Sequence, residues 1–199
     1  NANYLEIGCG TGFVLKMVEE NFPNWTINAS EAHSEGLDFT QKRLKNLSNL
    51  FQIDALDIPF SEEFDVIGAF DVIEHIEDDL AAIQQINSAL KTGGYLILSV
   101  PQHMFLWSIY DEMACHFRRY EPKELELKLK TNGFEIKESM SFVSLLLPLM
   151  FLSRNSGEKK REDFDIMGEF KISPFINFLL KQVQSIELFT IKLGIKWAF

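Results

Sequence analysis

A hydrophobic run that leads directly into a glycine-rich turn lies near the start of the chain and constrains its fold more than any other feature. Residues 4–12 read Tyr-Leu-Glu-Ile-Gly-Cys-Gly-Thr-Gly, and a segment of helical periodicity follows them. Glycine at positions 8, 10 and 12 lets the backbone turn tightly and approach a ligand where a Cβ atom would collide. A strand, a glycine-rich turn and a helix in this order favour a nucleotide-binding unit over a plain strand-to-helix turn.

The spacing of these glycines restricts the ligand. A dinucleotide-binding turn has the pattern Gly-x-Gly-x-x-Gly, whereas the third glycine here falls one residue early and Phe13 takes its place. The spacing therefore disfavours NAD and an NAD-dependent oxidoreductase. It favours a nucleoside ligand that carries no pyrophosphate.

Short β-rich runs alternate with helical segments between Asn3 and Phe142, which predicts an α/β fold with a doubly wound, mostly parallel sheet and helices on both faces. The expected strands cover residues 4–7, 25–29, 50–53, 64–70, 95–100 and 134–142. A helix over 13–22 would place Val14, Met17, Val18 and Phe22 on one face, and Pro23 prevents its continuation. A second helix over 78–90 has acidic residues at its start and two glycines, 93 and 94, after its last turn.

The C-terminal part of the chain changes in composition. Residues 153–173 are charged and polar without an apolar period, which predicts a mobile loop after a domain formed by residues 1–152. Ser173 and Pro174 then form an N-cap followed by proline at the first helical position, so we expect a helix over 173–193. Residues 174–199 are accordingly expected to form a helical appendage that leads into a final strand from about Ile191.

Charge and cysteine content exclude several kinds of partner. With 29 acidic and 19 basic residues the net charge is −10, which would repel nucleic acid. Cys9 and Cys115 are the only cysteines and no metal-ligand spacing is present, so we expect no disulfide framework, no metal site and a cytoplasmic location. The longest apolar run, residues 143–152, is about half of what a membrane span needs, so stable membrane insertion is not expected.

Two acidic positions follow predicted strands where a nucleoside would need them. Glu31 ends the second strand, roughly 20 residues beyond the glycine turn, where an acid accepts hydrogen bonds from ribose hydroxyls. Asp54 and Ala55 end the third strand, where the carboxylate can accept from an adenine amino group and the small side chain leaves room for the ring. Each position alone is equally consistent with a solvated surface residue, but the series in order supports a nucleoside site.

Together these segments resemble the class I S-adenosylmethionine-dependent methyltransferases, in particular the ubiquinone-biosynthesis-like branch. Residues 5–12 are similar to motif I of that family, residues 64–76 to its fourth strand and following loop, and residues 90–101 to its Gly-Gly turn and fifth strand. The resemblance implies a Rossmann-like sheet that binds S-adenosylmethionine and releases S-adenosylhomocysteine. The cofactor-binding residues it implies are Glu6, Gly8, Cys9, Gly10, Thr11, Gly12, Glu31, Asp54, Ala55 and Phe70.

The methyl acceptor is expected to bind beyond the fifth strand, at residues 106–120. This segment is similar to one found in a subset of bacterial methyltransferases, and it places His116, Arg118, Arg119 and Tyr120 together in an otherwise acidic chain. We interpret His116 as an orienting residue or base and Arg119 as a clamp for an anionic group. In the alternative interpretation, the two arginines pair with acids such as Glu121 or Glu124.

His75 is a further catalytic candidate because it follows the fourth strand at the ligand-binding edge of the sheet. It is equally consistent with a histidine that packs against the next helix, and Asp111 and Tyr120 are also possible bases.

The expected function is therefore methyl transfer to a small-molecule acceptor that is anionic or lipid-like. The alternative is a non-catalytic S-adenosylmethionine-binding or scaffold protein of the same fold. The apolar face of the C-terminal helix is expected to cover the substrate side, a partner subunit in a homodimer, or its own core.

Overall fold

The computed structural model describes residues 1–155 and 172–195 of the chain. These residues form two compact units. The first comprises Asn1–His103 and Cys115–Glu135, and the second comprises Met104–Ala114 and the described part of Ile136–Phe199. The predicted boundaries at residues 152 and 173 remain predictions, and most of the predicted charged loop lies outside the described residues.

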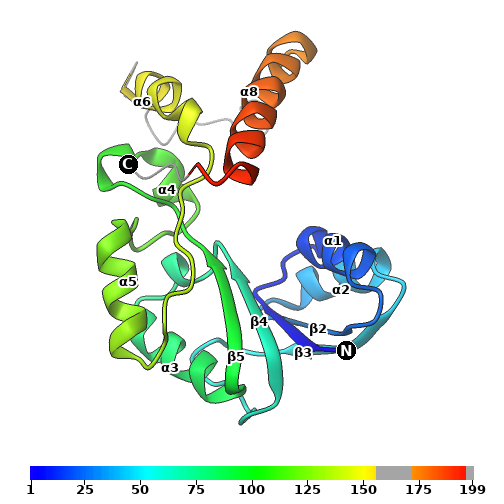
Figure 1. Cartoon of the computed structure of the whole chain (residues 1–199). Helices are drawn as coiled ribbons and strands as arrows, with labels where there is room; N and C mark the ends of the chain where they lie inside the picture. The colour runs from blue at the N-terminus through cyan, green and yellow to red at the C-terminus, as the bar shows by residue number, and fades with distance from the viewer. Residues whose placement is uncertain (156–171, 196–199) are drawn as a thin grey trace. The chain divides into compact units, whose positions relative to one another are not determined.

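A five-stranded parallel sheet forms the centre of the first unit (Figure 1). Its strands are β1 (Asn3–Ile7), β2 (Thr26–Glu31), β3 (Leu47–Gln52), β4 (Phe64–Phe70) and β5 (Leu90–Ser99). The order across the sheet is β3-β2-β1-β4-β5, so the direction of winding reverses between β1 and β4. In open parallel sheets, ligands bind outside the carboxyl ends of the strands at such a reversal.

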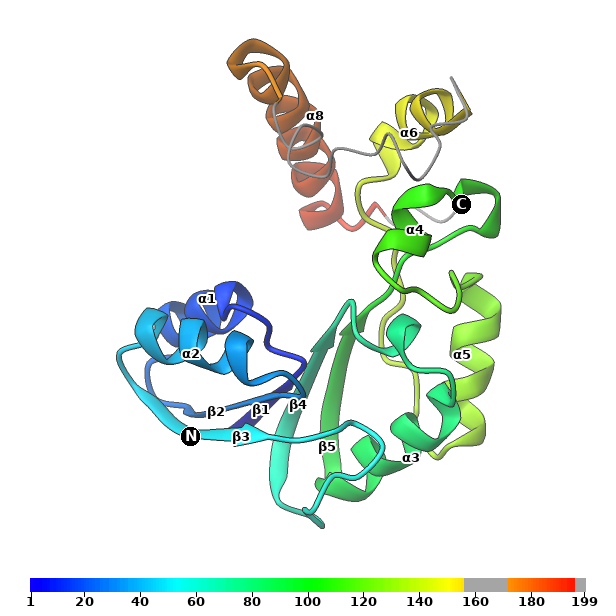
Figure 2. The same cartoon turned by 180° about the vertical axis from the view of Figure 1, so that it is seen from behind.

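Helices cover both faces of this sheet, as predicted (Figures 1 and 2). One face carries α1 (Phe13–Asn21) and α2 (Ser34–Arg43), and the other carries α3 (Asp79–Ala89) and α5 (Pro122–Thr131). Alternate residues of β1 supply the two cores: Tyr4 belongs to the cluster that includes Leu15 of α1, whereas Leu5 and Ile7 belong to the cluster that includes Ile86 of α3. The central strands β1 and β4 are buried along most of their length, whereas the edge strands β3 and β5 are partly exposed and more polar.

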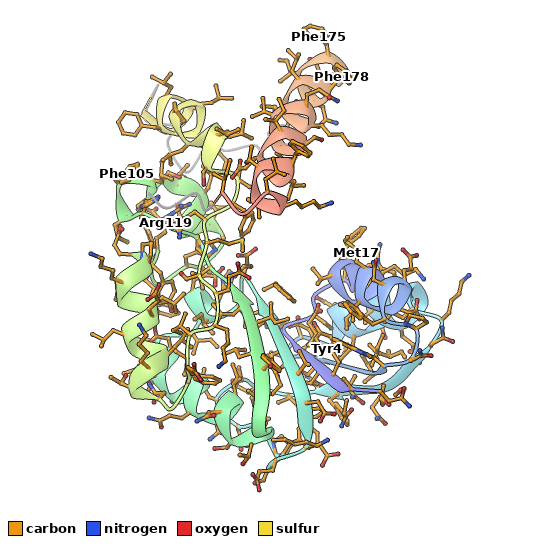
Figure 3. The ribbon with its side chains drawn as sticks, viewed as in Figure 1. Tyr4, Met17, Phe105, Arg119, Phe175 and Phe178 are labelled. Atoms are coloured by element: carbon orange, nitrogen blue, oxygen red, sulfur yellow. The ribbon has the colours of Figure 1, made fainter. Side chains whose placement is uncertain are left out.

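The buried face of α1 differs from the predicted one. Leu15 is fully buried and Val18 packs against the core, whereas Met17 is 64% exposed and points away from the sheet (Figure 3). Glu19 is buried because its carboxylate accepts backbone hydrogen bonds from Lys45 and Asn46. An apolar pattern cannot predict the burial of a charged residue such as Glu19.

Helix α3 has its predicted bounds, but the segment that follows it differs from its expected form. Asp78 caps the helix by accepting from the Ala81 amide at 3.0 Å, as its acidic start indicated. Leu90 is the C-cap of the helix, as its predicted end at residue 90 indicated, and at the same time the first residue of β5, so no turn at the glycine pair separates the helix from the strand. Gly93, with φ of 81°, instead lies within β5, where the register against β4 shifts.

The strand predicted over residues 134–142 is absent, because the sheet ends at β5. Phe134 packs against the core, but residues 137–140 are exposed. Met140 and Phe142 are exposed as well, so the alternating apolar side chains of this segment are not buried as they would be in an edge strand.

The second unit is helical in its described residues. It contains a 3₁₀ turn η2 (Met104–Leu106), α4 (Ile109–Met113), η3 (Ser144–Leu146), α6 (Leu147–Asn155) and α8 (Pro174–Lys192). The predicted cap of α8 is confirmed, since the Ser173 hydroxyl accepts from the Ile176 amide at 3.3 Å. Over the described residues the strand expected from Ile191 is not formed, since residues 191–192 are helical and residues 193–195 follow the helix without a strand; residues 196–199 lie outside the described residues.

A buried carboxylate connects two parts of this unit. Glu187 of α8 accepts from the amides of Ser144 and Leu145, at 2.8 and 3.2 Å, and so caps η3. Apolar side chains of α8, including Phe175 and Phe178, project from the helix (Figure 3), and what covers them remains a prediction. Within the described residues, no helix combines the length and apolar character that a membrane crossing requires.

Candidate functional site

The glycine-rich loop between β1 and α1 holds all three of its glycines in the left-handed region, with φ of 65°, 52° and 77° at Gly8, Gly10 and Gly12. Their surroundings differ. A Cβ atom at Gly8 would lie 2.6 Å from Val72, and one at Gly12 would lie 2.8 Å from Thr40, whereas one at Gly10 would meet nothing within 4 Å. Gly8 and Gly12 are therefore required by packing, and Gly10 is the position where the loop is open to a ligand.

Hydrogen bonds from β2 and α2 fix the shape of this loop. The Glu31 carboxylate accepts from the Gly10 amide at 2.9 Å, and the Thr40 hydroxyl donates to the Gly10 carbonyl at 3.0 Å. Arg43 donates from Nε to the Thr11 carbonyl at 2.7 Å. The loop is thus held in one conformation, so a ligand would not need to order it.

Two of the predicted cofactor residues lie in the interior. Glu6 accepts from the Tyr4 hydroxyl at 2.9 Å, and burial raises the pKa of its carboxyl group to about 7, against a smaller lowering by that hydrogen bond. Cys9 lies 3.6 Å from the Thr40 hydroxyl, and burial raises the pKa of its thiol to about 11. Both side chains therefore support the loop from within the protein.

The remaining predicted cofactor residues follow neighbouring strands. Asp54 is exposed after β3 and uses one carboxylate oxygen to accept from the Leu56 amide at 2.9 Å, while Ala55 beside it is buried. Phe70 is the last residue of β4 and is half-buried. Since the strands are parallel, these residues lie at the same sheet edge as the glycine loop and Glu31.

The turn after β4 brings the two predicted catalytic histidines together. His75 ends a 3₁₀ turn, η1 (Ile73–His75), and its ring lies edge-on to that of His116, with centroids 4.6 Å apart. The Phe117 amide donates to the Glu74 carbonyl at 2.8 Å, which ties the segment carrying His116 to this turn.

Glu74, which the sequence analysis did not select, lies beside this histidine pair. Its side chain is fully buried, and neither carboxylate oxygen has a hydrogen-bond partner. Burial raises the pKa of Glu74 to about 8, and the Arg119 guanidinium opposes this only weakly. The available signal was an acidic residue in the turn after a buried strand, but the functional interpretation was given to the neighbouring His75.

The segment after His116 divides into structural and candidate functional residues. Arg118 pairs with the buried Asp79 at 2.9 Å and donates to the Glu77 carbonyl, so it is structural. Tyr120 donates to Asp79 at 2.7 Å, and burial followed by this contact raises its pKa, which disfavours it as a base. Arg119 is only 7% exposed and donates to the Gln102 carbonyl at 3.0 Å.

Asp111, the other candidate base, lies in the second unit. Its carboxylate completes a capping box with Ser108 at the start of α4, accepting from the Ser108 amide at 3.0 Å. This contact gives it a local structural role.

Comparison with known proteins identifies the family of this sheet and loop. A family model described as a methyltransferase domain matches residues 1–139, which is more than half of the chain. The chain belongs to the class I methyltransferases. The family resemblance noted in the sequence is thereby confirmed, together with the Rossmann-like fold.

Two curated methyltransferases match part of the chain. The malonyl-[acyl-carrier protein] O-methyltransferase of Halalkalibacterium halodurans is 30% identical over 102 residues, which are 48% of this chain and 37% of that protein. The demethylmenaquinone methyltransferase of Staphylococcus carnosus is 33% identical over 108 residues, covering 47% of this chain and 40% of that protein. The chain thus spans less than half the length of each of these methyltransferases.

A solved methyltransferase structure shares the fold. Phosphoethanolamine N-methyltransferase 2 of Haemonchus contortus, in complex with S-adenosyl-L-methionine, is 19% identical with a TM-score of 0.60. The match covers 96% of this chain and 45% of that one.

Proposed function

We propose that this protein binds S-adenosylmethionine at the glycine-rich loop and transfers its methyl group to a small-molecule acceptor. The proposal rests on the arrangement around Gly10. The backbone there is left-handed, the space beside it is open, and the Glu31 carboxylate accepts a hydrogen bond from its amide. The methyltransferase family and the S-adenosylmethionine complex of a protein with the same fold support this cofactor.

The cofactor roles follow the order of the strands. The loop around Gly8, Gly10 and Gly12 would hold the methionine part, with Cys9, Thr11 and Glu6 shaping it. Glu31 would accept from the ribose hydroxyls. Asp54 would accept from the adenine amino group beside Ala55, and Phe70 would border the cofactor at the end of β4.

Methyl transfer needs alignment more than covalent catalysis. The sulfonium methyl group is already activated, so the protein has to place the acceptor in line with it, and such positioning can contribute roughly 7–11 kcal/mol. An acceptor hydroxyl must also lose a proton, which falls to His75 or His116. Arg119 would act on an anionic acceptor group through its positive charge.

Calorimetry with S-adenosylmethionine, S-adenosylhomocysteine and NAD tests the cofactor assignment. We expect the first two to bind with one equivalent each and NAD to show no binding. Binding of NAD alone would reject the proposal.

Radiolabelled methyl transfer to a hydroquinone and to a malonyl thioester then distinguishes a hydroxyl acceptor from a carboxylate acceptor. Cofactor binding without any transfer would favour the non-catalytic alternative.

Replacing Glu31 by alanine should weaken S-adenosylhomocysteine binding by roughly 1.5–3 kcal/mol, because the ribose hydroxyls lose a charged acceptor. The Gly10 amide also loses its partner. Calorimetry on Glu31→Ala checks this, with Glu35→Ala as the matched control, since Glu35 is an exposed glutamate in the first turn of α2. Equal affinity in both variants would mean that Glu31 is a solvated surface residue with no role in cofactor binding.

Replacing His116 by alanine should lower kcat by at least about 100-fold on an acceptor found in the transfer assay, while the affinity for S-adenosylmethionine stays unchanged. Arg119→Lys, which keeps the charge but loses the planar fork, should mainly raise KM. Steady-state kinetics and calorimetry together separate these effects. Wild-type kinetics in both variants would place acceptor binding elsewhere.

A further inference from the structure

The buried carboxyl group of Glu74 lacks hydrogen-bond partners among the described residues. Its side chain is fully buried, and neither carboxylate oxygen has a hydrogen-bond partner. A buried carboxylate is costly unless it is paired, hydrogen-bonded or bound to a metal ion. The network around Asp79 shows the usual solution, in which one buried carboxylate accepts from Tyr120, Arg118 and Lys128.

Two histidine side chains close to Glu74 are of a type that binds metal ions. One ligand atom from each of Glu74, His75 and His116 lies within 4.8 Å of the other two. The backbone hydrogen bond from Phe117 to Glu74 holds the two segments together, so the cluster does not depend on side-chain contacts alone. The burial of the cluster is graded, with Glu74 buried, His116 half-buried and His75 exposed, which gives an ion a route from solvent.

We propose that Glu74, His75 and His116 bind one divalent transition-metal ion. Two imidazoles and one carboxylate suit zinc and its first-row neighbours, whereas magnesium and calcium prefer oxygen ligands. Ligands of a tetrahedral ion with bonds near 2.1 Å lie about 3.4 Å apart, so the three side chains would draw together by roughly 1 Å on binding. Three protein ligands leave a coordination position for water or substrate.

No metal site was predicted from the sequence. That prediction rested on the absence of a CxxC motif and of a His/Cys ligand series, and this cluster uses no cysteine and brings together residues that are far apart in the sequence. The proposed ion would lie at His75 and His116, the residues to which the proposed function assigns removal of the acceptor proton. A hydroxyl coordinated there would lose its proton more readily; this role rests on the proposed function, but metal binding itself does not.

Calorimetric titration of the full chain tests the site, after metal is removed with a chelator and the chelator is exchanged away. We expect zinc chloride to bind with one equivalent, and magnesium chloride to bind at least about 100-fold more weakly. Glu74→Gln, which keeps the shape of the side chain, and His116→Ala should each weaken zinc binding by more than about 100-fold. Two controls should bind zinc as the wild type does: His33→Ala, which removes an exposed histidine elsewhere, and Cys115→Ser, which removes the exposed thiol beside His116.

Several outcomes would overturn the metal site: no saturable zinc binding, unchanged affinity in Glu74→Gln and His116→Ala, or preference for magnesium. Thermal unfolding of each variant checks that it is folded. If Glu74→Gln does not fold, the exposed His75 provides the test through His75→Ala. Titration of the same samples with S-adenosylhomocysteine distinguishes the two proposals. Zinc binding without cofactor binding would reject only the proposed function, and cofactor binding without zinc binding would reject only the metal site.

Discussion

Replacing Gly10 by valine should abolish measurable binding of S-adenosylmethionine and S-adenosylhomocysteine. Gly10 is the loop glycine whose side-chain position is open, so a valine side chain would occupy the space through which the backbone meets the cofactor. Its φ of 52° adds backbone strain, because a β-branched residue is strongly disfavoured in the left-handed region. Calorimetry with S-adenosylhomocysteine is the measurement.

Gly93 provides a matched control for the strain. It has φ of 81°, and an added Cβ atom there would also meet nothing within 4 Å, but it lies in β5 at the far end from the glycine loop. Gly93→Val should therefore lose a similar amount of stability and keep wild-type cofactor affinity. If Gly10→Val binds the cofactor normally, the central premise of the proposed function is lost; if it does not fold, Gly10→Ala takes its place.

Replacing Asp79 by asparagine should lower the free energy of unfolding by about 3 kcal/mol, because it breaks a largely buried charge cluster. Asp79 is 3% exposed, and its carboxylate meets Arg118 at 2.9 Å, Lys128 at 2.6 Å and Tyr120 at 2.7 Å. The two cations are partly exposed and can recover some hydration, which keeps the loss at the lower end for buried pairs. Urea unfolding at neutral pH measures the effect.

The same variant has a defined pH signature. Burial raises the pKa of Asp79, but the contacts with Lys128, Tyr120 and Arg118 outweigh it, so the pKa is lowered in the folded protein. The stabilisation is therefore complete above the unfolded-state pKa of about 3.9 and is lost as pH falls through the lower folded value. The gap between wild type and Asp79→Asn should close below about pH 4.

Asp78→Asn supplies the control for Asp79→Asn. Asp78 is the adjacent N-cap of α3, and asparagine caps a helix about as well as aspartate does. This variant should change stability little at any pH. An equal loss in both variants would mean that the effect comes from the start of the helix and not from the charge cluster.

The sequence predicted the sheet well because each strand carried its own local pattern. The apolar run of β4 was placed at its observed bounds, Phe64–Phe70, and the glycine turn and Glu31 were correctly placed at the same sheet edge. Parallel topology explains this success, since knowing where each strand ends is enough to bring those ends together. His75 and His116 were each predicted as catalytic candidates, but their contact was not predicted and is a finding of the structure.

The errors concern features that are set by tertiary contacts. The burial of Glu19 depends on amides beyond α2, so no periodicity within α1 could show it. The segment over residues 134–142 alternates like a strand, but it does not join the sheet and leaves Met140 and Phe142 exposed. The isolation of the Glu74 carboxylate is likewise a property of what surrounds it, and a sequence does not show which polar atoms lack partners.

The division of the chain into two units has a consequence for how the protein is made. The chain passes from one unit to the other after His103, after Ala114 and after Glu135. During synthesis, Met104–Ala114 therefore leaves the ribosome before the sheet-bearing unit is complete and long before Glu187 can cap η3. No single cut in the gene separates the units: isolating the sheet-bearing unit requires an internal deletion that joins His103 to Cys115, and a simple C-terminal truncation leaves a helix of the second unit without the rest of its fold.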